Sequence, residues 1–470
     1  MKHYGLLGEK LGHSYSCQIH NYIYNQFHID ATYHLIECQE NELIGYIQKL
    51  KDGIYSGFNV TIPYKKAIIS YLDGIDEKAK QIGSVNTVYL KNGKAYGTNT
   101  DYDGFLETLK HYQIDAAKKD CFILGTGGAS LAVGAVLKDF GGNCIFVSRT
   151  PKNDEISYRT LEEKKIDILV NTTPVGMYPN VDESPVSKEI AQRAKVVMDI
   201  IFNPKQTKLL CDANSKMNGL HMLISQAIQA EKIWQNQDLP ISIQKMSESI
   251  EFIFSLPKEI LLYASNLNYK KDSLGRSGDE IYNFSNQYIL KISLDKKRLR
   301  KEKEKTDWLY DRIHGMKSIA YKETQEKAYY LRTCLQGNSL ISKELLANPP
   351  LLIKNVTRAV DLLRSLDKEN CPFLSDSQGN HFIHGDLCLP NIYVNHETIG
   401  FIDLDNSGLG DVWSDYAWLL WSFEFNLRTR KWTPVLLESL NLKMDEKKYN
   451  QYISKESQER LKRRLEDIDE

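Results

Sequence analysis

Long apolar runs are missing from this sequence, because no segment approaches the roughly 20 apolar residues that a membrane-spanning helix requires. The first residues, MKHYGLLGEKLGHSYS, lack the uninterrupted apolar core of a signal peptide. Closely spaced cysteines are also missing, since the eight cysteines lie far apart and form no C-x-x-C pair. This spacing argues against a disulfide framework or a structural zinc site and favours reduced thiols. We therefore expect a cytoplasmic protein without a membrane partner.

An excess of either charge is missing as well, since 60 basic residues stand against 61 acidic ones. A balanced charge gives no electrostatic support for a nucleic-acid partner. What the chain has is length, because 470 residues exceed the roughly 250 to 300 residues that one core organises. With 42% hydrophobic residues, it can build more than one core. At least two folding units are expected.

The first half of the sequence alternates short apolar runs with amphipathic stretches, which is typical of βαβ units and a parallel sheet. The runs that predict strands are CFILG at 121–125, NCIFVS at 143–148, IDILVN at 166–171 and VVMDII at 196–201. A closing helix is expected at 241–254, with Pro257 soon after it. We place a domain boundary there, although no Gly/Ser-rich linker marks it.

The second half begins with a different pattern. The segment EIYNFSNQYILKIS at 280–293 predicts a hairpin that turns near Ser285 and Asn286. The segment 296–313 predicts a highly charged helix. Its charge run at 296–305 is more typical of a solvated helix face than of a binding tail.

A glycine-rich turn, GTGGAS at 125–130, directly follows one predicted strand and opens a helix-like segment. Glycines allow the backbone to approach a pyrophosphate, and free N–H groups at a helix start can hold it. Such turns are often simple loops, so the strand before it and the helix after it carry the argument. The candidate dinucleotide-binding residues are Gly125, Gly127, Gly128 and Ala129.

The next strand ends in Ser148, Arg149 and Thr150, where an NAD-binding fold would carry Asp or Glu for the ribose 2′-hydroxyl. Arg149 instead offers a guanidinium group suited to a 2′-phosphate, which indicates NADP. An ordinary surface arginine is the alternative interpretation.

Hydroxyl, amide, lysine and aspartate side chains recur in four motifs of the first half. The motifs are GHSYS at 12–16, NVTIPYK at 59–65, GSVNTV at 83–88 and TNTDYDG at 98–104. Gathered at strand ends, these groups would suit a small polyhydroxylated acid with an acid/base pair beside a ketone. Their spacing alone does not say which acid.

In this order and spacing, the motifs resemble the shikimate dehydrogenase family over residues 1 to about 254. The likeness continues in NTTPVGM at 171–177, FNPKQTKLL at 202–210 and GLHMLISQA at 219–227. It implies a substrate-binding catalytic domain at 1–101 with 237–254 and a Rossmann NADP-binding domain at 102–236. It also implies reversible, NADP-dependent reduction of 3-dehydroshikimate to shikimate.

Residue roles follow from this resemblance. It implies that Lys65 and Asp101 are the catalytic pair, with an exposed salt bridge as the alternative. The implied substrate and cofactor contacts are Ser14, Ser16 and Thr61 for the carboxylate, Asn59, Asn86 and Gln226 for the hydroxyls, and Gly219 and Met222 for the cofactor. The sequence departs from the family pattern at Cys17, where a proline is usual, at Phe202, where a tyrosine is usual, and at Ser148, where an asparagine is usual.

A second set of motifs is typical of phosphoryl transfer. HGDLCLPN at 384–391 and GFIDLD at 400–405 supply Asp386, Asn391 and Asp403. Phosphoryl transfer needs such a carboxylate for the acceptor hydroxyl and oxygen ligands for Mg²⁺. Upstream, Lys291 and Glu302 could grip the phosphates of ATP. Ser277 lies in LGRSGDEIY at 274–282, the expected nucleotide-covering loop.

This half resembles aminoglycoside 3′-phosphotransferases in LPKEI at 256–260, SGDEIY at 277–282, CPF at 371–373 and LCLPNI at 387–392. The resemblance implies a protein-kinase-like α+β domain at 256–470 and an α/β multidomain chain. It implies that Asp386 is the base, that Asn391 and Asp403 bind Mg²⁺, and that Asp415 braces the loop. The segment between 373 and 384 is shorter than in that family, which removes much of the expected antibiotic-binding wall.

Two hypotheses remain for the second half, namely an active small-molecule kinase and a non-catalytic nucleotide-binding or scaffolding module. If it is active, we predict that shikimate or a related small anion is a better acceptor than an aminoglycoside. Arg428, Arg430 and Lys431 would attract a carboxylate and repel a cationic antibiotic. The alternative for these three residues is a solvated face. The sequence does not indicate the oligomeric state.

Overall fold

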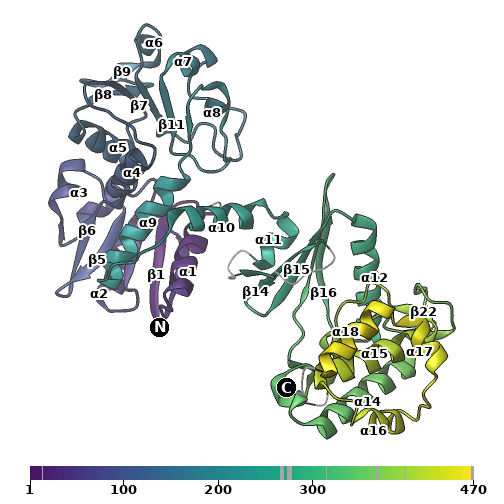
Figure 1. Cartoon of the computed structure of the whole chain (residues 1–470). Helices are drawn as coiled ribbons and strands as arrows, with labels where there is room; N and C mark the ends of the chain where they lie inside the picture. The colour runs from purple at the N-terminus through teal and green to yellow at the C-terminus, as the bar shows by residue number, and fades with distance from the viewer. Residues whose placement is uncertain are drawn as a thin grey trace. The chain divides into compact units, whose positions relative to one another are not determined.

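The structure is a computed structural model that describes residues 1–12, 14–264, 269–272, 278–313, 315–366, 370–396 and 398–466. The chain divides into two compact units, Met1–Ser255 and Leu256–Glu470 (Figure 1). Among the described residues, no helix combines the length and the apolar character needed to cross a bilayer.

The first unit contains a mixed six-stranded sheet in the order β2-β1-β3-β5-β6-β4. Its strands are β1 (Lys2–Gly8), β2 (Ala31–Glu37), β3 (Gly57–Val60), β4 (Gly74–Ile75), β5 (Thr87–Lys91) and β6 (Lys94–Thr98). Its helices are α1 (Ser16–Gln26), α2 (Leu43–Lys51), α3 (Glu77–Ile82), α9 (Leu220–Gln235) and α10 (Ile243–Ser255). All four residues of β3 are buried, so the end of this strand is a rigid support for the NVTIPYK motif.

The same unit contains a second six-stranded sheet, in the order β12-β11-β10-β7-β8-β9, and every pairing in it is parallel. Its strands are β7 (Asp120–Leu124), β8 (Asn143–Ser148), β9 (Ile156–Ser157), β10 (Ile168–Asn171), β11 (Val196–Asp199) and β12 (Lys216–Met217). Its helices are α4 (Thr100–His111), α5 (Gly128–Asp139), α6 (Tyr158–Leu161), α7 (Lys188–Arg193) and α8 (Lys208–Asp212).

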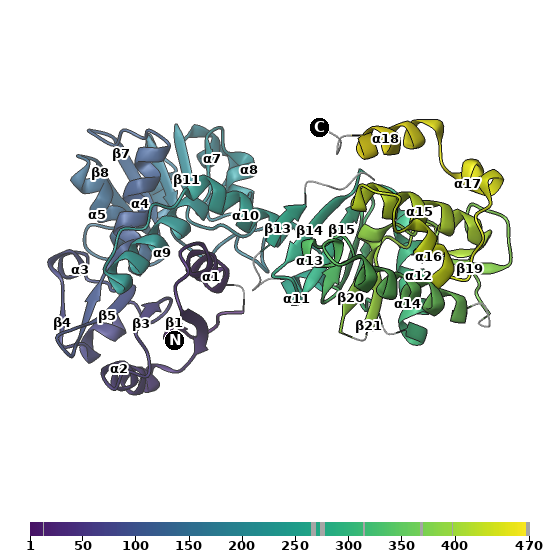
Figure 2. The same ribbon diagram turned by 60° about the horizontal axis from the view of Figure 1, so that its bottom comes forward.

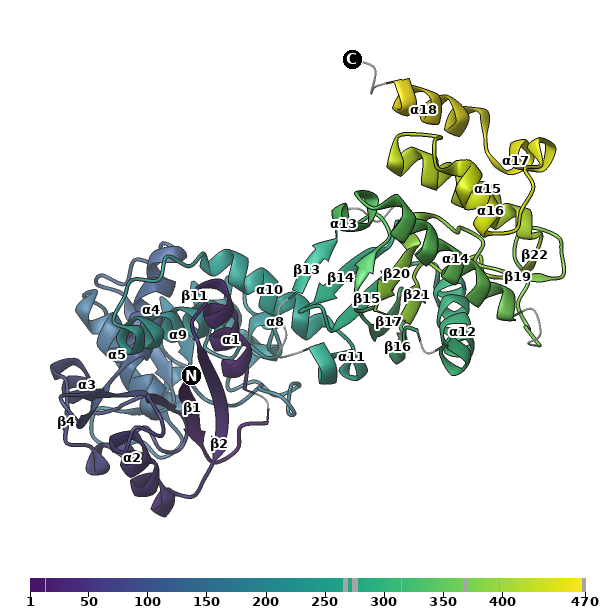
Figure 3. The same ribbon diagram turned by 90° about the horizontal axis from the view of Figure 1, so that it is seen from below.

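Read from β9 to β12, this sheet has the strand order of a Rossmann fold, with its switch point between β7 and β10. The predicted strands at 121–125, 143–148, 166–171 and 196–201 are confirmed as β7, β8, β10 and β11. The helices α4 and α9 pack against each other and connect the two sheets of the unit (Figures 1 and 3).

The second unit begins with a five-stranded antiparallel sheet in the order β13-β14-β15-β17-β16. Its elements are α11 (Lys258–Ala264), β13 (Tyr269–Asp272), β14 (Glu280–Phe284), β15 (Tyr288–Ser293), α12 (Lys296–Ile313), β16 (Ser318–Glu323) and β17 (Ala328–Thr333). The predicted hairpin is confirmed, and Ser285 and Asn286 turn it with positive φ angles of 52° and 57°.

A mainly helical part follows the sheet (Figure 2). Its helices are α13 (Lys343–Leu346), α14 (Pro349–Ser365), α15 (Val412–Leu427), α16 (Thr433–Ser439), α17 (Glu446–Tyr452) and α18 (Lys455–Glu466). Its strands are β18 (Asn338–Ser339), β19 (His381–Ile383), β20 (Ile392–Asn395), β21 (Thr398–Phe401) and β22 (Gly408–Gly410). A sheet followed by helices is the layout of a protein-kinase-like domain.

The predicted charged helix is α12, and its bounds match the expected segment. The prediction of a solvated face is wrong for Lys305, which is only 5% exposed, whereas Glu302, which was predicted to pair with Lys291, is 1% exposed. Both are buried because β15 and the segment after β21 supply partners for their charges. The charge run therefore contributes to the interior of this unit.

We predict opposite effects for two glycine substitutions in the first unit. In Gly57→Ala, the new methyl carbon would lie 2.3 Å from Trp234 Nε1. We expect this overpacking to lower the free energy of unfolding by roughly 1–3 kcal/mol. In Gly45→Ala, on the exposed face of α2, no atom lies within 4 Å of the new carbon. Here the higher helix propensity of alanine should raise the free energy of unfolding by roughly 0.5–1 kcal/mol. Calorimetric melting of both full-length variants checks this, and a stable Gly57→Ala protein would contradict the packing described for Trp234.

Candidate active sites

The predicted catalytic pair lies between the two six-stranded sheets of the first unit. Lys65 follows β3, and Asp101 lies in the first turn of α4. Lys65 Nζ donates to Asp101 Oδ2 over 2.5 Å, and the two side chains are only 13% and 8% exposed. The alternative of an exposed salt bridge is therefore wrong. An ion pair this well buried costs desolvation energy, which makes a functional site the better explanation.

Asn86 holds this pair in place. Its side-chain nitrogen donates to Asp101 Oδ1 over 2.9 Å and to Gln226 Oε1 over 3.3 Å. Its oxygen accepts from the Thr100 backbone N–H over 2.7 Å. Because Lys65 takes one oxygen of Asp101 and Asn86 the other, the carboxylate has a fixed orientation. Asn86 therefore brings together residues from β5, α4 and α9.

The other predicted substrate residues surround the carboxyl ends of β1 and β3. Ser14 Oγ donates to Ser16 Oγ over 3.1 Å, and Ser16 begins α1. Thr61 packs across Gly8 at the end of β1, since a side chain there would lie 2.7 Å from Thr61 Cγ2. Asn59 is buried and donates to Thr87 Oγ1 over 3.1 Å. His13, within the first motif, lies outside the described residues.

Phe202, one of the departures from the family pattern, packs against Tyr15, which lies between the two serines. The ring centroids of Phe202 and Tyr15 are 4.8 Å apart, and Tyr15 also stacks on Phe254. An apolar ring therefore occupies the place where the family pattern has a hydroxyl.

The predicted nucleotide loop connects β7 to α5. Gly125 adopts a φ of 103°, which only glycine adopts readily, and Gly127 precedes the first turn of α5. A side chain on Gly127 would meet no atom within 4 Å, so the outer side of the loop is open. A side chain on Gly128 would lie 3.0 Å from Lys65 Cβ. The loop therefore lies directly against Lys65, the predicted catalytic lysine, with Ala129 beside it in the first turn of α5.

Ser148, Arg149 and Thr150 follow the carboxyl end of β8, beside this loop. Ser148 Oγ accepts from the Thr150 N–H over 3.2 Å, which shapes the turn. Arg149 is exposed and forms no ion pair with any of the described residues. Its guanidinium group is available to an anion.

Gly219 and Met222 lie at the start of α9. A side chain on Gly219 would lie 1.9 Å from the Ile200 carbonyl oxygen, so only glycine lets α9 begin against the end of β11. Met222 is buried, and its carbonyl oxygen lies close to Gly104 of α4. The two predicted cofactor residues thus belong to the junction of α4 and α9.

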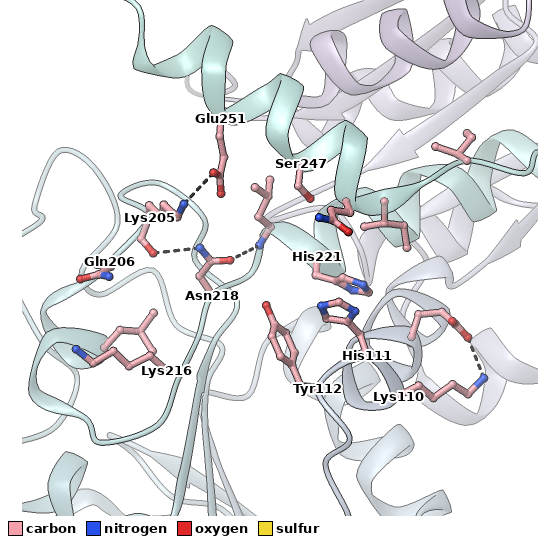
Figure 4. A pocket seen from close by; sticks show the side chains of 16 residues that line it. Lys110, His111, Tyr112, Lys205, Gln206, Lys216, Asn218, His221, Ser247 and Glu251 are labelled. Carbon is pink, nitrogen blue, oxygen red and sulfur yellow. Dashed lines mark hydrogen bonds and ion pairs between the residues drawn. The ribbon is translucent and has the colours of Figure 1, made fainter.

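A separate pocket of about 1020 Å³ lies at the other end of α4, between α9 and α10 (Figure 4). None of the predicted site residues lines it. Two of its lysines are paired within it, Lys205 with Glu251 over 2.8 Å and Lys110 with Glu107 over 2.9 Å. It therefore has little free charge for the phosphates of a nucleotide.

In the second unit, the structure brings together residues from three motifs. Lys291 Nζ, on β15, donates to Glu302 Oε1 of α12 over 2.7 Å and lies 3.8 Å from Asp403 Oδ1. Burial raises the pKa of Glu302 to about 7, although the Lys291 ammonium opposes this. Asp403 has a left-handed backbone conformation with a φ of 62°, and its side chain is 54% exposed. Ser277 lies outside the described residues.

The HGDLCLPN motif at 384–391 is held by hydrogen bonds to its backbone and side chains. Asn391 Nδ2 donates to Asp386 Oδ2 over 3.1 Å, which leaves the side-chain oxygen of Asn391, Oδ1, for a cation. Asp415 accepts from the backbone N–H groups of His384 and Gly385 over 2.6 and 2.8 Å. The brace expected at Asp415 is therefore present, and burial raises its pKa to about 6.

Arg298, which belongs to none of the motifs in the sequence, connects three parts of this unit. Arg298, on α12, hydrogen-bonds Asp279 before β14 and Asp405 after Asp403. Lys305 Nζ, on the same face of α12, donates to the Asp405 carbonyl oxygen over 2.5 Å. No signal in the sequence pairs residues this far apart. Within the described residues, no group of three or more His, Cys, Asp or Glu side chains could hold a metal ion.

The three basic residues at the end of α15 are partly engaged with neighbours. Arg430 pairs with Glu424 over 3.2 Å, and Lys431 lies over the ring of Trp432. Arg428 ends α15 with a φ of 56°. The preference for an anionic acceptor therefore draws less support from these residues than their charges alone suggest.

Comparison with protein families gives two matches. A model described as the shikimate dehydrogenase substrate binding domain matches residues 6–88. A model described as the phosphotransferase enzyme family matches residues 376–432. The second match includes Asp386, Asn391 and Asp403.

Relatives of the first unit are similar over nearly their whole length. The shikimate dehydrogenase (NADP(+)) of Clostridium beijerinckii is 42% identical over 268 residues, which cover 54% of this chain and 98% of that protein. The solved structure of shikimate dehydrogenase 1 from Peptoclostridium difficile is 40% identical, covers 54% of this chain and 99% of that one, and gives a TM-score of 0.51. A shikimate dehydrogenase solved in complex with NADP+ is 35% identical and gives a TM-score of 0.50. The match covers 55% of this chain and 96% of that one.

These matches confirm the predicted fold class, with substrate and Rossmann domains followed by a kinase-like phosphotransferase domain. Through its first unit, the chain belongs to the shikimate dehydrogenase family.

Proposed function

We propose that the first unit catalyses the reversible, NADP-dependent reduction of 3-dehydroshikimate to shikimate. The observation that carries this proposal is the buried Lys65–Asp101 pair lying against Gly128 of the nucleotide loop. The relatives described above bear the name shikimate dehydrogenase (NADP(+)), and one was solved with NADP+. The open side of Gly127 and the unpaired guanidinium of Arg149 are compatible with an NADP-type dinucleotide.

The residues of the chain account for the proton in this reaction. NADPH supplies a hydride to the substrate ketone when it is bound. Lys65 Nζ then protonates or orients the developing alkoxide, because it is the cation held at the site. Asp101 holds this ammonium group in place through its hydrogen bond. Asn86 fixes the second oxygen of Asp101, so the carboxylate cannot turn away from Lys65.

For the second unit, we propose an ATP- and Mg²⁺-dependent small-molecule phosphotransferase. The observation that supports this proposal is the cluster in which Lys291 pairs with both Glu302 and Asp403. Lys291 would bind phosphate oxygens, while Asn391 and Asp403 would supply oxygen ligands to Mg²⁺. Asp386 would accept or orient the proton of the acceptor hydroxyl. A non-catalytic nucleotide-binding or scaffolding module is the second candidate, favoured by the short connection between Phe373 and His384.

Replacing the catalytic lysine should separate turnover from cofactor binding. Lys65→Met preserves the length of the aliphatic part of the lysine side chain but removes the ammonium group. We therefore expect kcat to fall by roughly 10²- to 10⁴-fold. Binding of NADPH, measured by fluorescence titration, should stay close to the wild-type value. The same substitution at the neighbouring exposed residue, Lys66→Met, is the control. Equal losses of turnover and of cofactor binding would point to a folding role for Lys65.

Arg149 should decide between the two nicotinamide cofactors. Arg149→Ala removes the cation proposed to meet the 2′-phosphate, so the KM for NADP+ should rise by roughly tenfold or more. The KM for NAD+, which has no such phosphate, should change little and is the internal control. Unchanged discrimination between the two cofactors would contradict the assignment of Arg149.

A panel of acceptors tests the second unit. ADP release from ATP and Mg²⁺ should be measured with shikimate, quinate, kanamycin and neomycin, for the wild-type chain and for Asp386→Ala. We expect release with shikimate or quinate that Asp386→Ala abolishes, because the acceptor hydroxyl loses its base. Release only with kanamycin or neomycin would contradict the predicted acceptor class. No release with any acceptor, together with retained nucleotide binding, would favour the non-catalytic module.

A further inference from the structure

Tyr33, in the middle of β2, carries a hydroxyl group that lies beside Asn59, one of the proposed substrate-binding residues. It donates to Asn59 Oδ1 over 2.7 Å, and both side chains are buried. No motif in the sequence includes this tyrosine. Burial raises the pKa of Tyr33 well above its ordinary value, so the hydroxyl keeps its proton and remains a donor.

The amide of Asn59 is hydrogen-bonded at both its nitrogen and its oxygen. Its nitrogen donates to Thr87 Oγ1 over 3.1 Å and to the Asn86 carbonyl oxygen over 3.3 Å, which uses both of its hydrogens. Its oxygen accepts from Tyr33 and retains one lone pair. Asn59 can therefore accept from a substrate hydroxyl but has no spare hydrogen to donate. Without the Tyr33 hydroxyl, this amide would lose one of the three bonds that fix its orientation.

The ring of Tyr33 packs against a buried pair of side chains, His20 and Glu231. It stacks on His20 with ring centroids 3.9 Å apart and an interplanar angle of 5°. His20 Nδ1 lies 2.6 Å from Glu231 Oε1, and both of these side chains are 0% exposed. His20 belongs to α1 and Glu231 to α9, so two helices hold the tyrosine against the sheet.

We infer that Tyr33 is a positioning residue of the dehydrogenase site, which orients the Asn59 side-chain oxygen toward a substrate hydroxyl. This inference rests on the proposed function of the first unit. It makes Tyr33 a determinant of specificity for substrates that present a hydroxyl group to Asn59. It also gives the buried His20–Glu231 pair a role, because that pair supports the ring of Tyr33.

The test is Tyr33→Phe in the full-length protein, because phenylalanine keeps the stacked ring and removes only the hydroxyl. The KM for shikimate should rise by roughly tenfold, the effect of about 1.4 kcal/mol of lost positioning. The KM for NADP+ should stay at the wild-type value, and kcat should change much less than the KM for shikimate. The matched control is Tyr4→Phe, since Tyr4 is equally buried but its hydroxyl accepts from Gln235, outside the site.

A second comparison shows whether Tyr33 acts through Asn59. In an Asn59→Ala background, Tyr33→Phe should raise the KM for shikimate by clearly less than it does alone, because the amide that Tyr33 orients is already absent. An unchanged KM in Tyr33→Phe would overturn the inference. A parallel rise of both KM values with a lower melting temperature would also overturn it, as a structural effect. If the wild-type protein does not oxidise shikimate, the proposed dehydrogenase function fails, and this inference falls with it.

Discussion

The dehydrogenase site depends on the close approach of α4 and α9 at Gly104. A side chain at that position would lie 2.7 Å from the Met222 carbonyl oxygen, so only glycine permits this packing. Asp101 lies one turn before Gly104 on α4, and Gln226 lies one turn after Met222 on α9. Asn86 bonds to both Asp101 and Gln226, and this is possible only at the observed separation of the helices. The position of Asp101, and with it that of the proposed catalytic pair, is thus a consequence of backbone packing.

The sequence predicted those parts of the structure that local patterns determine. The strands of the Rossmann sheet, the hairpin at Ser285 and Asn286, and the charged helix α12 each have a periodicity or turn signal of their own. The kinase-like cluster was also foreseeable, because Lys291, Glu302 and Asp403 each follow from the order of the motifs along the chain. Each of these predictions used neighbours along the chain or the order of known motifs.

The residues that sequence reasoning missed have partners far away in the chain. Tyr33 lies in an ordinary strand sequence, and its role arises only when β2 brings it beside Asn59. Arg298 looks like one more cation of a solvated helix, yet it joins Asp279 to Asp405. The burial of Glu302 and Lys305 was likewise invisible, since it depends on groups outside α12. Such residues emerge only from tertiary contacts.

The two units are constrained to different degrees. In the first, Lys65 bonds to Asp101, Asp101 bonds to Asn86, and Gly128 of the predicted nucleotide loop packs against Lys65. In the second, the cluster proposed for nucleotide and Mg²⁺ is well ordered, whereas the connection before His384 is short and the nearby cations are partly engaged. The chemistry of the first unit is therefore the more sharply defined of the two.

The most direct measurement of the central claim is the rate of cofactor reduction by the purified wild-type chain with shikimate. We predict shikimate-dependent formation of NADPH from NADP+, followed by absorbance, with NAD+ giving a much lower kcat/KM. No reduction of either cofactor by shikimate, in a protein shown to be folded, would contradict the account.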